Sequence, residues 1–169
     1  MRVLPYVRGY YPRDTAYRLW SLMEAEGAAS KLFFSGVPHG TDVNCLGDLT
    51  QFVQSLATRE TLVMQHLESG EIAGLFWYED FIPSHRALVS IFVRRRFWGE
   101  VAKEIADLGL RYGFEVFQLK HIWALTAWPT SASIAERCGM TLVATLEDYV
   151  LDEQGEPRDV KLYRKRRED

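Results

Sequence analysis

A run of β-branched and apolar residues that ends abruptly in three arginines places the strongest constraint on how this chain folds. The run covers residues 87–93, Arg94, Arg95 and Arg96 follow it, and a helical pattern begins after Gly99. A strand that turns tightly into a helix directs several free backbone N–H groups at one point, where the helix dipole adds partial positive charge. Such a corner binds phosphate, and neighbouring guanidinium groups match phosphate with two donors each. The sequence therefore predicts a phosphate-bearing ligand at this strand–helix junction.

The composition is that of one ordinary globular unit. The 169 residues suit a single domain over residues 1–169, and 47% hydrophobic with 25% charged residues is typical of a soluble protein. A net charge of −3 gives the molecule no drive toward nucleic acid, and no apolar run approaches the roughly 20 residues of a membrane span. Cys45 and Cys138 lie far apart and the four histidines are scattered, which favours free thiols in a reducing cytoplasm and no metal site.

Hydrophobic periodicity predicts a mixed α/β fold. The 87–93 strand is apolar on both faces, so we expect it at the centre of a sheet, and Gly74 in its antiparallel neighbour indicates a bulge or a close backbone contact. The expected elements, in order, are a strand at 2–7, a helix that Asp14 caps and Gly27 ends, a helix at 46–56, strands at 61–67, 71–78 and 87–93, a helix at 98–112 that Gly113 ends, a strand at 117–126, a short helix that Thr130 or Ser131 caps and Gly139 stops, and strands at 140–150 and 160–163.

This order of elements resembles the GNAT acyltransferase fold, most strongly over residues 70–163. The family's acyl-CoA signature, Arg/Gln-x-x-Gly-x-Gly/Ala, is similar to residues 96–101, where Val101 replaces the usual small residue. The Asn-x-x-Ser pattern of the branch that acetylates N-termini of ribosomal proteins is similar to residues 130–133, and its Gly-Phe to Gly139-Met140. A closing hairpin adds the third motif, which consists of Gly155, Asp159, Val160, Leu162 and Tyr163.

The resemblance implies an α/β (α+β) fold with a mixed, mostly antiparallel sheet of about seven strands flanked by about four helices. It also implies acetyl-CoA as co-substrate, no metal, and transfer of an acetyl group to a primary amine on a small molecule or a protein N-terminus. The cofactor contacts implied are Ile91, Phe92, Val93, Arg94, Arg95, Arg96, Phe97, Trp98, Gly99, Glu100, Val101 and Ser133, with the N–H groups of residues 97–101 as donors to the pyrophosphate.

Three side chains are candidates for the chemistry. The resemblance nominates Ser133 to meet the leaving thiolate, although its position is also an ordinary one in the first turn of a short helix. Glu147 and Asp148 either take the proton of the amine and attract a cationic substrate, or form a solvated strand face. The tyrosine acid of many relatives is excluded, because Ala135 stands four residues before Gly139.

Five further residues have both a functional and a structural interpretation. Glu79 and Asp80 border the substrate groove or form a charged turn, and the turn is favoured. His121 lies near the thioester or is a structural histidine, again the favoured interpretation. Trp98 and Trp128 cover the cofactor or pack in the core.

Two functions stay open on the sequence. The chain is an acyl-CoA-dependent N-acyltransferase, with residues 35–42 and the second helix helping to shape the acceptor pocket, or it is a catalytically weak or inactive GNAT-fold protein for binding or assembly. Val101 bears on this choice. If its side chain turns into the core, the turn stays open to phosphate. If it does not, the side chain weakens or alters the cofactor site. Exposed aromatic residues would also support a homodimer.

Overall fold

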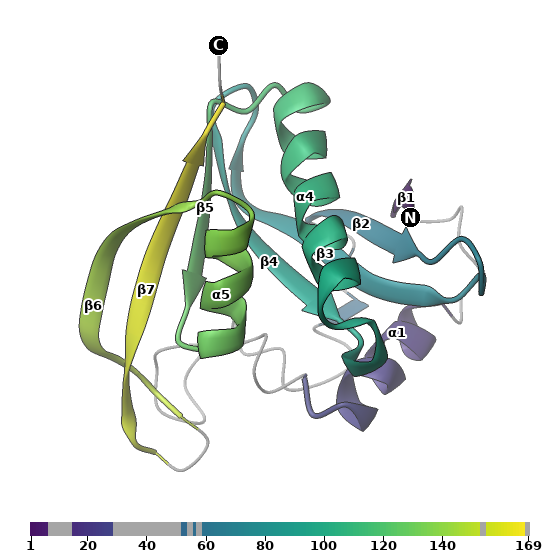
Figure 1. Ribbon diagram of the computed structural model, residues 1–169, viewed down its shortest axis with the longest axis horizontal. Helices are drawn as coiled ribbons and strands as arrows, with labels where there is room; N and C mark the ends of the chain where they lie inside the picture. Colours follow the sequence, from purple (N-terminus) through teal and green to yellow (C-terminus); the bar gives the residue numbers. More distant parts are fainter. Residues whose placement is uncertain (7–14, 29–51, 54–55, 57–58, 153–154, 168–169) are drawn as a thin grey trace.

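The computed structural model describes residues 1–6, 15–28, 52–53, 56, 59–152 and 155–167 (Figure 1). The expected Asp14 cap, most of the expected second helix and the loop at 35–42 lie outside these residues. The elements are β1 (Arg2–Pro5), α1 (Thr15–Ala25), β2 (Glu60–Gln65), β3 (Ile72–Ile82), β4 (Arg86–Val93), a 3-10 turn η1 (Arg95–Phe97), α4 (Glu100–Glu115), β5 (His121–Thr126), α5 (Pro129–Arg137), β6 (Thr141–Leu151) and β7 (Pro157–Arg166).

Seven strands form one mixed sheet, in the order β1-β2-β3-β4-β5-β7-β6. The neighbouring strands of this sheet are antiparallel except for β4 and β5, which α4 connects as a crossover. The predicted fold class and the central position of the 87–93 strand are confirmed. The described residues form three α-helices, where the sequence predicted about four.

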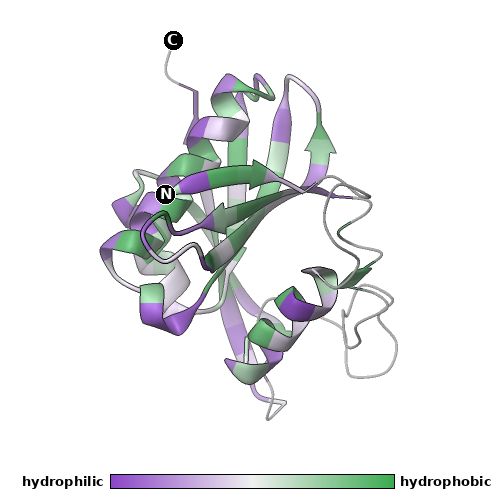
Figure 2. Cartoon of the chain, turned by 90° about the vertical axis from the view of Figure 1, so that its right-hand side faces the viewer, coloured by the Kyte–Doolittle hydropathy of each residue, from purple (hydrophilic) through white to green (hydrophobic). Residues whose placement is uncertain are grey.

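The sheet has a separate hydrophobic core on each face. Met64 and Phe76 face α4 and α5, whereas their chain neighbours Val63 and Leu75 face α1. This is the period-two alternation that a strand buried on both sides requires. Figure 2 shows the sheet between α1 on one side and the other two helices on the opposite side.

Gly74 satisfies both parts of its prediction. The β2–β3 register shifts between Met64 and Gln65, next to the pairing of Gly74 with Met64. A Cβ at Gly74 would also collide with the backbone carbonyl of Phe92 on β4. The glycine therefore allows close contact between two central strands.

Two predicted helix ends are wrong. α4 continues through Gly113 to Glu115, because this glycine serves packing: a Cβ there would lie 2.8 Å from Cδ1 of Ile122. α5 begins at Pro129 with Trp128 as its N-cap, so neither Thr130 nor Ser131 caps it. Proline suits the first helical position, since its missing N–H would have no intrahelical partner there.

Candidate functional site

The sheet opens between its two parallel strands. β4 and β5 pair from Arg86↔His121 to Val89↔Ala124, after which β5 pairs with β7 alone. Within the described chain, the edge of β4 at residues 90–93 that faces β5 therefore has no strand partner. Unpaired backbone groups of this kind accept an extended ligand as if it were an added strand.

A cavity of about 280 Å³ occupies this opening. Its walls reach both faces of the sheet, because they include Ala106 of α4 on one side and Glu79 of β3 on the other. The lining residues are Arg59, Phe76, Glu79, Leu88, Val89, Ser90, Ile91, Ala106, Leu110, Ala124, Leu125, Thr126, Ala127, Trp128, Ser131, Ile134, Ala135, Cys138, Met140, Tyr149, Val150 and Val160. Two ligands that approach from opposite faces can thus meet inside the opening.

The turn that follows β4 has the geometry of an anion site. Gly99 adopts φ 90° and ψ −128°, which glycine alone tolerates readily, and no heavy atom lies within 4 Å of the place a Cβ would take. The first bond of α4 runs from the Lys103 N–H to the Gly99 carbonyl (3.2 Å). The N–H groups of Glu100, Val101 and Ala102 are therefore without intrahelical acceptors, as at any helix start.

Part of the predicted donor set is already used by the protein. The Phe97 N–H donates to the Arg94 carbonyl (2.8 Å) and the Trp98 N–H donates to the Arg95 carbonyl (3.2 Å). The indole Nε1–H of Trp98, a side chain that is 55% exposed, donates to the Val93 carbonyl (2.9 Å). Among the described residues, the backbone donors that face no protein partner begin at Gly99, two residues later than the sequence suggested.

Val101 follows the first of the two alternatives that the sequence left open. Its side chain is partly buried and packs against the core beneath α4 and α5. A β-branched residue at this place therefore does not fill the corner above the helix start.

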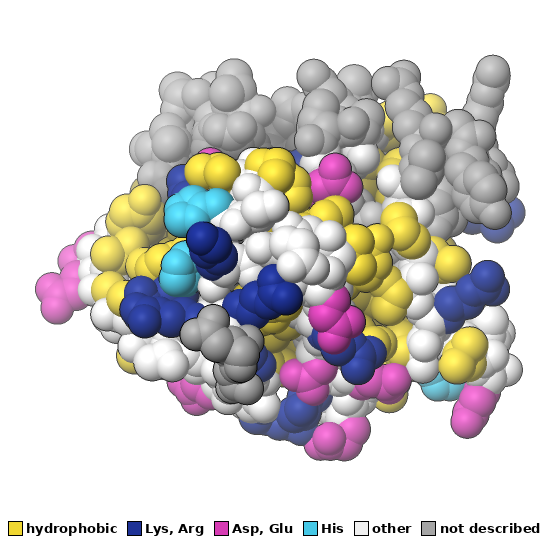
Figure 3. All heavy atoms as spheres, turned by 90° about the horizontal axis from the view of Figure 1, so that it is seen from above, with side chains coloured by type: hydrophobic (Ala, Val, Ile, Leu, Met, Phe, Trp, Pro, Cys, Tyr) yellow, Lys and Arg dark blue, Asp and Glu magenta, His cyan; other side chains and the backbone are white. Residues whose placement is uncertain are grey.

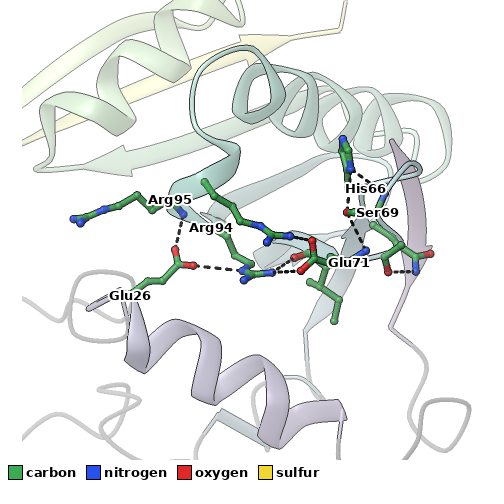
Figure 4. A network of polar contacts seen from close by, with 10 residues as sticks. Glu26, His66, Ser69, Glu71, Arg94 and Arg95 are labelled. Carbon is green, nitrogen blue, oxygen red and sulfur yellow. Dashed lines mark hydrogen bonds and ion pairs between the residues drawn. The ribbon is translucent and has the colours of Figure 1, made fainter.

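Two glutamates hold the arginine run, as Figure 4 shows. Glu26, which follows α1, accepts a hydrogen bond from the backbone N–H of Arg95 (2.5 Å) and another from Nε of Arg94 (3.4 Å). Glu71 forms ion pairs with Arg94 (3.8 Å) and with Arg96. The guanidinium of Arg95 instead lies 5.6 Å from the centre of the Trp98 ring, with no carboxylate partner in the described part of the chain. Of the three arginines, Arg95 is thus the one with an uncommitted charge.

Glu79 is the carboxylate that the fold brings into the cavity. It accepts hydrogen bonds from Nε1 of Trp77 (2.6 Å), Oγ of Ser90 (3.0 Å) and Nη1 of Arg59 (3.2 Å), and its side chain is 24% exposed. Asp80 lies outside the cavity, where it pairs with Arg86 (3.1 Å). The charged-turn interpretation fits Asp80, whereas Glu79 lines the groove.

The structure separates the two serines of the short helix. Ser131 lines the cavity, whereas Ser133 is exposed and lies outside the lining. The Asn-x-x-Ser comparison placed the motif on residues 130–133, but α5 starts at Pro129. Proline at the first helical position was the signal that could have indicated the earlier start.

Glu147 and Asp148 lie on a bulge of β6. The β6–β7 register runs from Leu146↔Val160 to Val150↔Arg158, so the bulge contains two extra residues on β6. Asp148 adopts φ 48° and its N–H donates to Oδ1 of Asp159 (3.0 Å). Both carboxylates are exposed and outside the cavity lining, whereas the adjacent Tyr149 lines it. Sequence reasoning missed Tyr149, because a bulge interrupts the alternation from which a strand face is inferred.

Two further titratable groups have shifted pKa values. Burial, followed by the nearby Asp107 carboxylate, raises the pKa of Cys138 to about 12, so this thiol in the cavity wall stays protonated. His121 begins β5 at the opposite end from the cavity. Burial, followed by the charge of Arg166, lowers its pKa. A structural role for His121 remains the favoured interpretation.

Neither a membrane-spanning helix nor a metal-binding cluster is found among the described residues. No helix there is both long and apolar enough to cross a bilayer. No group of three or more His, Cys, Asp or Glu side chains there is arranged to hold a metal ion.

Comparison with known proteins gave matches through structure alone. No family model matches the sequence. No curated protein matches it either.

Solved structures resemble the whole chain at low sequence identity. The ribosomal-protein-S5-alanine acetyltransferase from Vibrio fischeri superimposes with a TM-score of 0.72 at 14% identity, over 98% of each chain. A spermidine N-acetyltransferase from Vibrio cholerae gives 0.72 at 16% identity, over 98% of this chain and 95% of that one. A GNAT-family acetyltransferase from Bacillus anthracis gives 0.69 at 16% identity, with the same coverage. This chain therefore has the fold of the GNAT acetyltransferases.

Proposed function

We propose that this protein is an acyl-CoA-dependent N-acyltransferase, a single domain over residues 1–169 that transfers an acetyl group from acetyl-CoA to a primary amine. One observation carries the proposal: β4 and β5 diverge beyond Val89↔Ala124, and the strand edge exposed there leads directly to an open helix start at Gly99. The acetyltransferase activity of the structural neighbours supports the same reaction class.

The donor would bind along β4 and the turn. The N–H groups of Gly99, Glu100 and Val101 would bind the diphosphate, with the Arg95 guanidinium beside them. The pantetheine arm would pair with the free edge of β4 at Ile91, in the way an added strand pairs. The thioester would then enter the cavity at Ser90 and Ile91.

The chemistry requires a neutral amine and a proton for the departing sulfur. The amine nitrogen forms a bond to the thioester carbonyl carbon, the C–S bond breaks, and the amine gives up one proton. Glu79 would accept this proton, because it is the carboxylate in the cavity lining and three donors fix its orientation.

Hydroxyl groups in or near the cavity would assist the leaving group. We assign the hydrogen bond to the departing CoA thiolate to the hydroxyl of Ser131 rather than to that of Ser133, since Ser131 lines the cavity. Glu147 and Asp148, next to Tyr149, would attract a cationic amine toward the opening. With Cys138 held as a thiol, this arrangement suits a reducing cytoplasm.

A non-catalytic GNAT-fold binding protein is the second candidate. It is favoured by the pairing of Arg94 and Arg96 with glutamates, since these arginines are then less available to phosphate. Ala135 in the cavity wall also provides no hydroxyl group where many relatives have tyrosine.

Two matched glycine variants test the proposal. Gly99 and Gly155 both have positive φ, and both have open space where a Cβ would be, so alanine at either site strains the backbone without a steric clash. Millimolar acetyl-CoA should raise the melting temperature of the natural protein and of Gly155→Ala. Gly99→Ala should lose most of this shift, because it distorts the turn that presents the N–H groups.

The outcomes separate the two candidates. Release of CoA thiol with an amine acceptor supports the transferase. A thermal shift without thiol release from any amine supports the binding protein. No shift in the natural protein at millimolar acetyl-CoA would contradict both the donor site and the enzyme.

A further inference from the structure

The sheet face that bears Glu79 continues across β4, β5 and β7. Strand register places Glu79 opposite Leu88, Leu88 opposite Trp123, and Trp123 opposite Arg164. Directly opposed residues project to the same face of a sheet, so these four side chains form one row. Neighbouring strands lie about 4.8 Å apart, so roughly 14 Å of sheet separates Glu79 in the cavity from Arg164.

A second row lies two residues further from the cavity and owes its positive charge to two arginines. It consists of Arg86, His121 and Arg166, again in direct register across β4, β5 and β7. His85 lies beside it, with its ring 5.9 Å from that of His121. Figure 3 views this end of the molecule and shows Lys and Arg side chains gathered around histidines.

The positive charge of these rows is only partly neutralised. Asp80 pairs with Arg86 (3.1 Å), but Arg164 and Arg166 have no carboxylate partner within the described chain. The Arg164 guanidinium lies 5.3 Å from the centre of the Trp123 ring. Nδ1 of His121 is buried without a hydrogen-bond partner among these residues. The face thus combines a carboxylate in the cavity, an aromatic centre and a cationic end.

From this arrangement we infer that the acceptor is the N-terminal amine of an extended polypeptide with acidic side chains within its first five residues. The inference rests on the proposed transferase function. The amine would lie at Glu79 and Ser90, the peptide would cross Trp123, and its acidic side chains would meet Arg164 and Arg166.

Length and charge together select this class of acceptor. An extended chain advances about 3.3 Å per residue, so about four residues bridge the roughly 14 Å from Glu79 to Arg164. A small amine that binds Glu79 does not reach the cationic rows. A polyamine such as spermidine, which one structural neighbour is named for, would bring its second charge toward like charges.

Three synthetic peptides with one shared N-terminal dipeptide test the inference. Positions three to five carry Glu, Gln or Lys, and acetylation is followed by CoA thiol release. We expect kcat/KM to be highest for the Glu peptide and at least about tenfold lower for the Lys peptide, with the difference shrinking as salt is added.

Arginine variants locate the preference. Arg166→Gln and Arg164→Gln should each reduce the Glu-over-Lys ratio several-fold, and Arg166→Glu should reverse it. Arg111→Gln, on the exposed face of α4, is the matched control and should leave the ratio unchanged. The acetyl-CoA thermal shift of each variant shows that the donor site is intact.

The failure of this inference differs from failure of the proposed function. Equal or reversed preference in the natural protein, or acetylation of small amines but of no peptide, overturns the acidic-peptide inference and leaves the transferase standing. If no amine is acetylated, the transferase fails. Fluorescence anisotropy of the same labelled peptides, in the presence of CoA, then decides whether the face still prefers acidic chains.

Discussion

At the scale of single residues, the start of α5 determines which of Ser131 and Ser133 reaches the cavity. Residues i and i+2 of an α-helix are about 200° apart around its axis, so the side chains of Ser131 and Ser133 point in nearly opposite directions. Ser131 lines the cavity and Ser133 faces solvent. The choice between them depends on where α5 starts and on its packing.

The serine pair provides a matched test of the leaving-group assignment. Ser131→Ala should lower kcat about 10²-fold, because the departing sulfur loses its hydroxyl partner, with little change in acetyl-CoA affinity. Ser133→Ala should leave both quantities close to those of the natural protein. Steady-state kinetics with acetyl-CoA and an excess of amine measure the effect, and a loss confined to Ser133→Ala would restore the original assignment.

Glu79 is the residue whose surroundings the sequence did not indicate. In sequence it is one of two adjacent acids before a turn, and exposed acids are common there. Its surroundings come from β3, β4 and the start of β2 together, which bring Trp77, Ser90 and Arg59 to Oε1 of Glu79. None of these contacts follows from the spacing of residues along the chain.

At the scale of elements, glutamates next to the ends of α1 and β3 brace the turn that follows β4. Glu26 and Glu71 connect these elements to Arg94 at the end of β4, and Glu71 also engages Arg96. This network gives the arginine-rich turn a defined shape. It also places negative charge beside the proposed diphosphate site.

Removing one of these carboxylates should strengthen donor binding. Glu71→Gln frees Arg96, whose side chain is 46% exposed, and we expect the Kd for acetyl-CoA to fall a few-fold at low salt. Titration calorimetry at two salt concentrations measures this, since the gain should diminish as screening increases. Glu115→Gln, at the far end of α4, is the control and should change nothing. Weaker binding of acetyl-CoA to Glu71→Gln would contradict this prediction. It would mean that the ion pairs of Glu71 with Arg94 and Arg96 help binding, by holding the turn in shape, more than the negative charge of Glu71 hinders it.

Gly113 shows why element ends are hard to read from sequence. Glycine is a common helix stop, yet here it lies inside α4 because β3 and β5 leave no room for a side chain. Tyr78, Leu119 and Ile122 are the neighbours that a Cβ would contact. Local conformational preference predicted a stop, and packing between layers overruled it.

At the scale of the whole molecule, charge is distributed unevenly despite a net value of only −3. Glu147, Asp148 and Asp159 lie together at the β6–β7 bulge, whereas Arg164 and Arg166 follow along β7. An amine with an acidic body complements such a surface end to end.

The cationic end should make stability depend on pH through His121. Its folded pKa lies below the 6.5 of an ordinary histidine, owing to burial and then to Arg166, His85, Arg164 and Lys120. The unfolded state therefore binds the proton first as pH falls below 6.5, and the folded state loses stability there until its own pKa is passed. His121→Gln should lose less unfolding free energy than the natural protein between pH 7.5 and pH 5.5. Urea denaturation at both pH values measures the difference, and equal losses would contradict this role.

The sequence by itself determined the features that depend on short-range order. The 87–93 strand, the arginine run, Gly99 and the helix after it follow from local periodicity and from the conformational freedom of glycine. The order of elements followed from the same information. Its resemblance to the GNAT fold rested on that order and on three motifs similar to those of the family, and the structural neighbours confirm the fold.

Tertiary structure alone decided where strands part and which side chains meet. The divergence of β4 from β5, the bulge beside which Tyr149 lines the cavity, and the pairing of Glu26 and Glu71 with arginines join residues far apart in the chain. Local preferences act over a few residues, whereas these contacts depend on the register and packing of whole layers. For this reason the strand, the turn at Gly99 and the helix start were predictable from sequence, and the cavity with Glu79 in its wall was not.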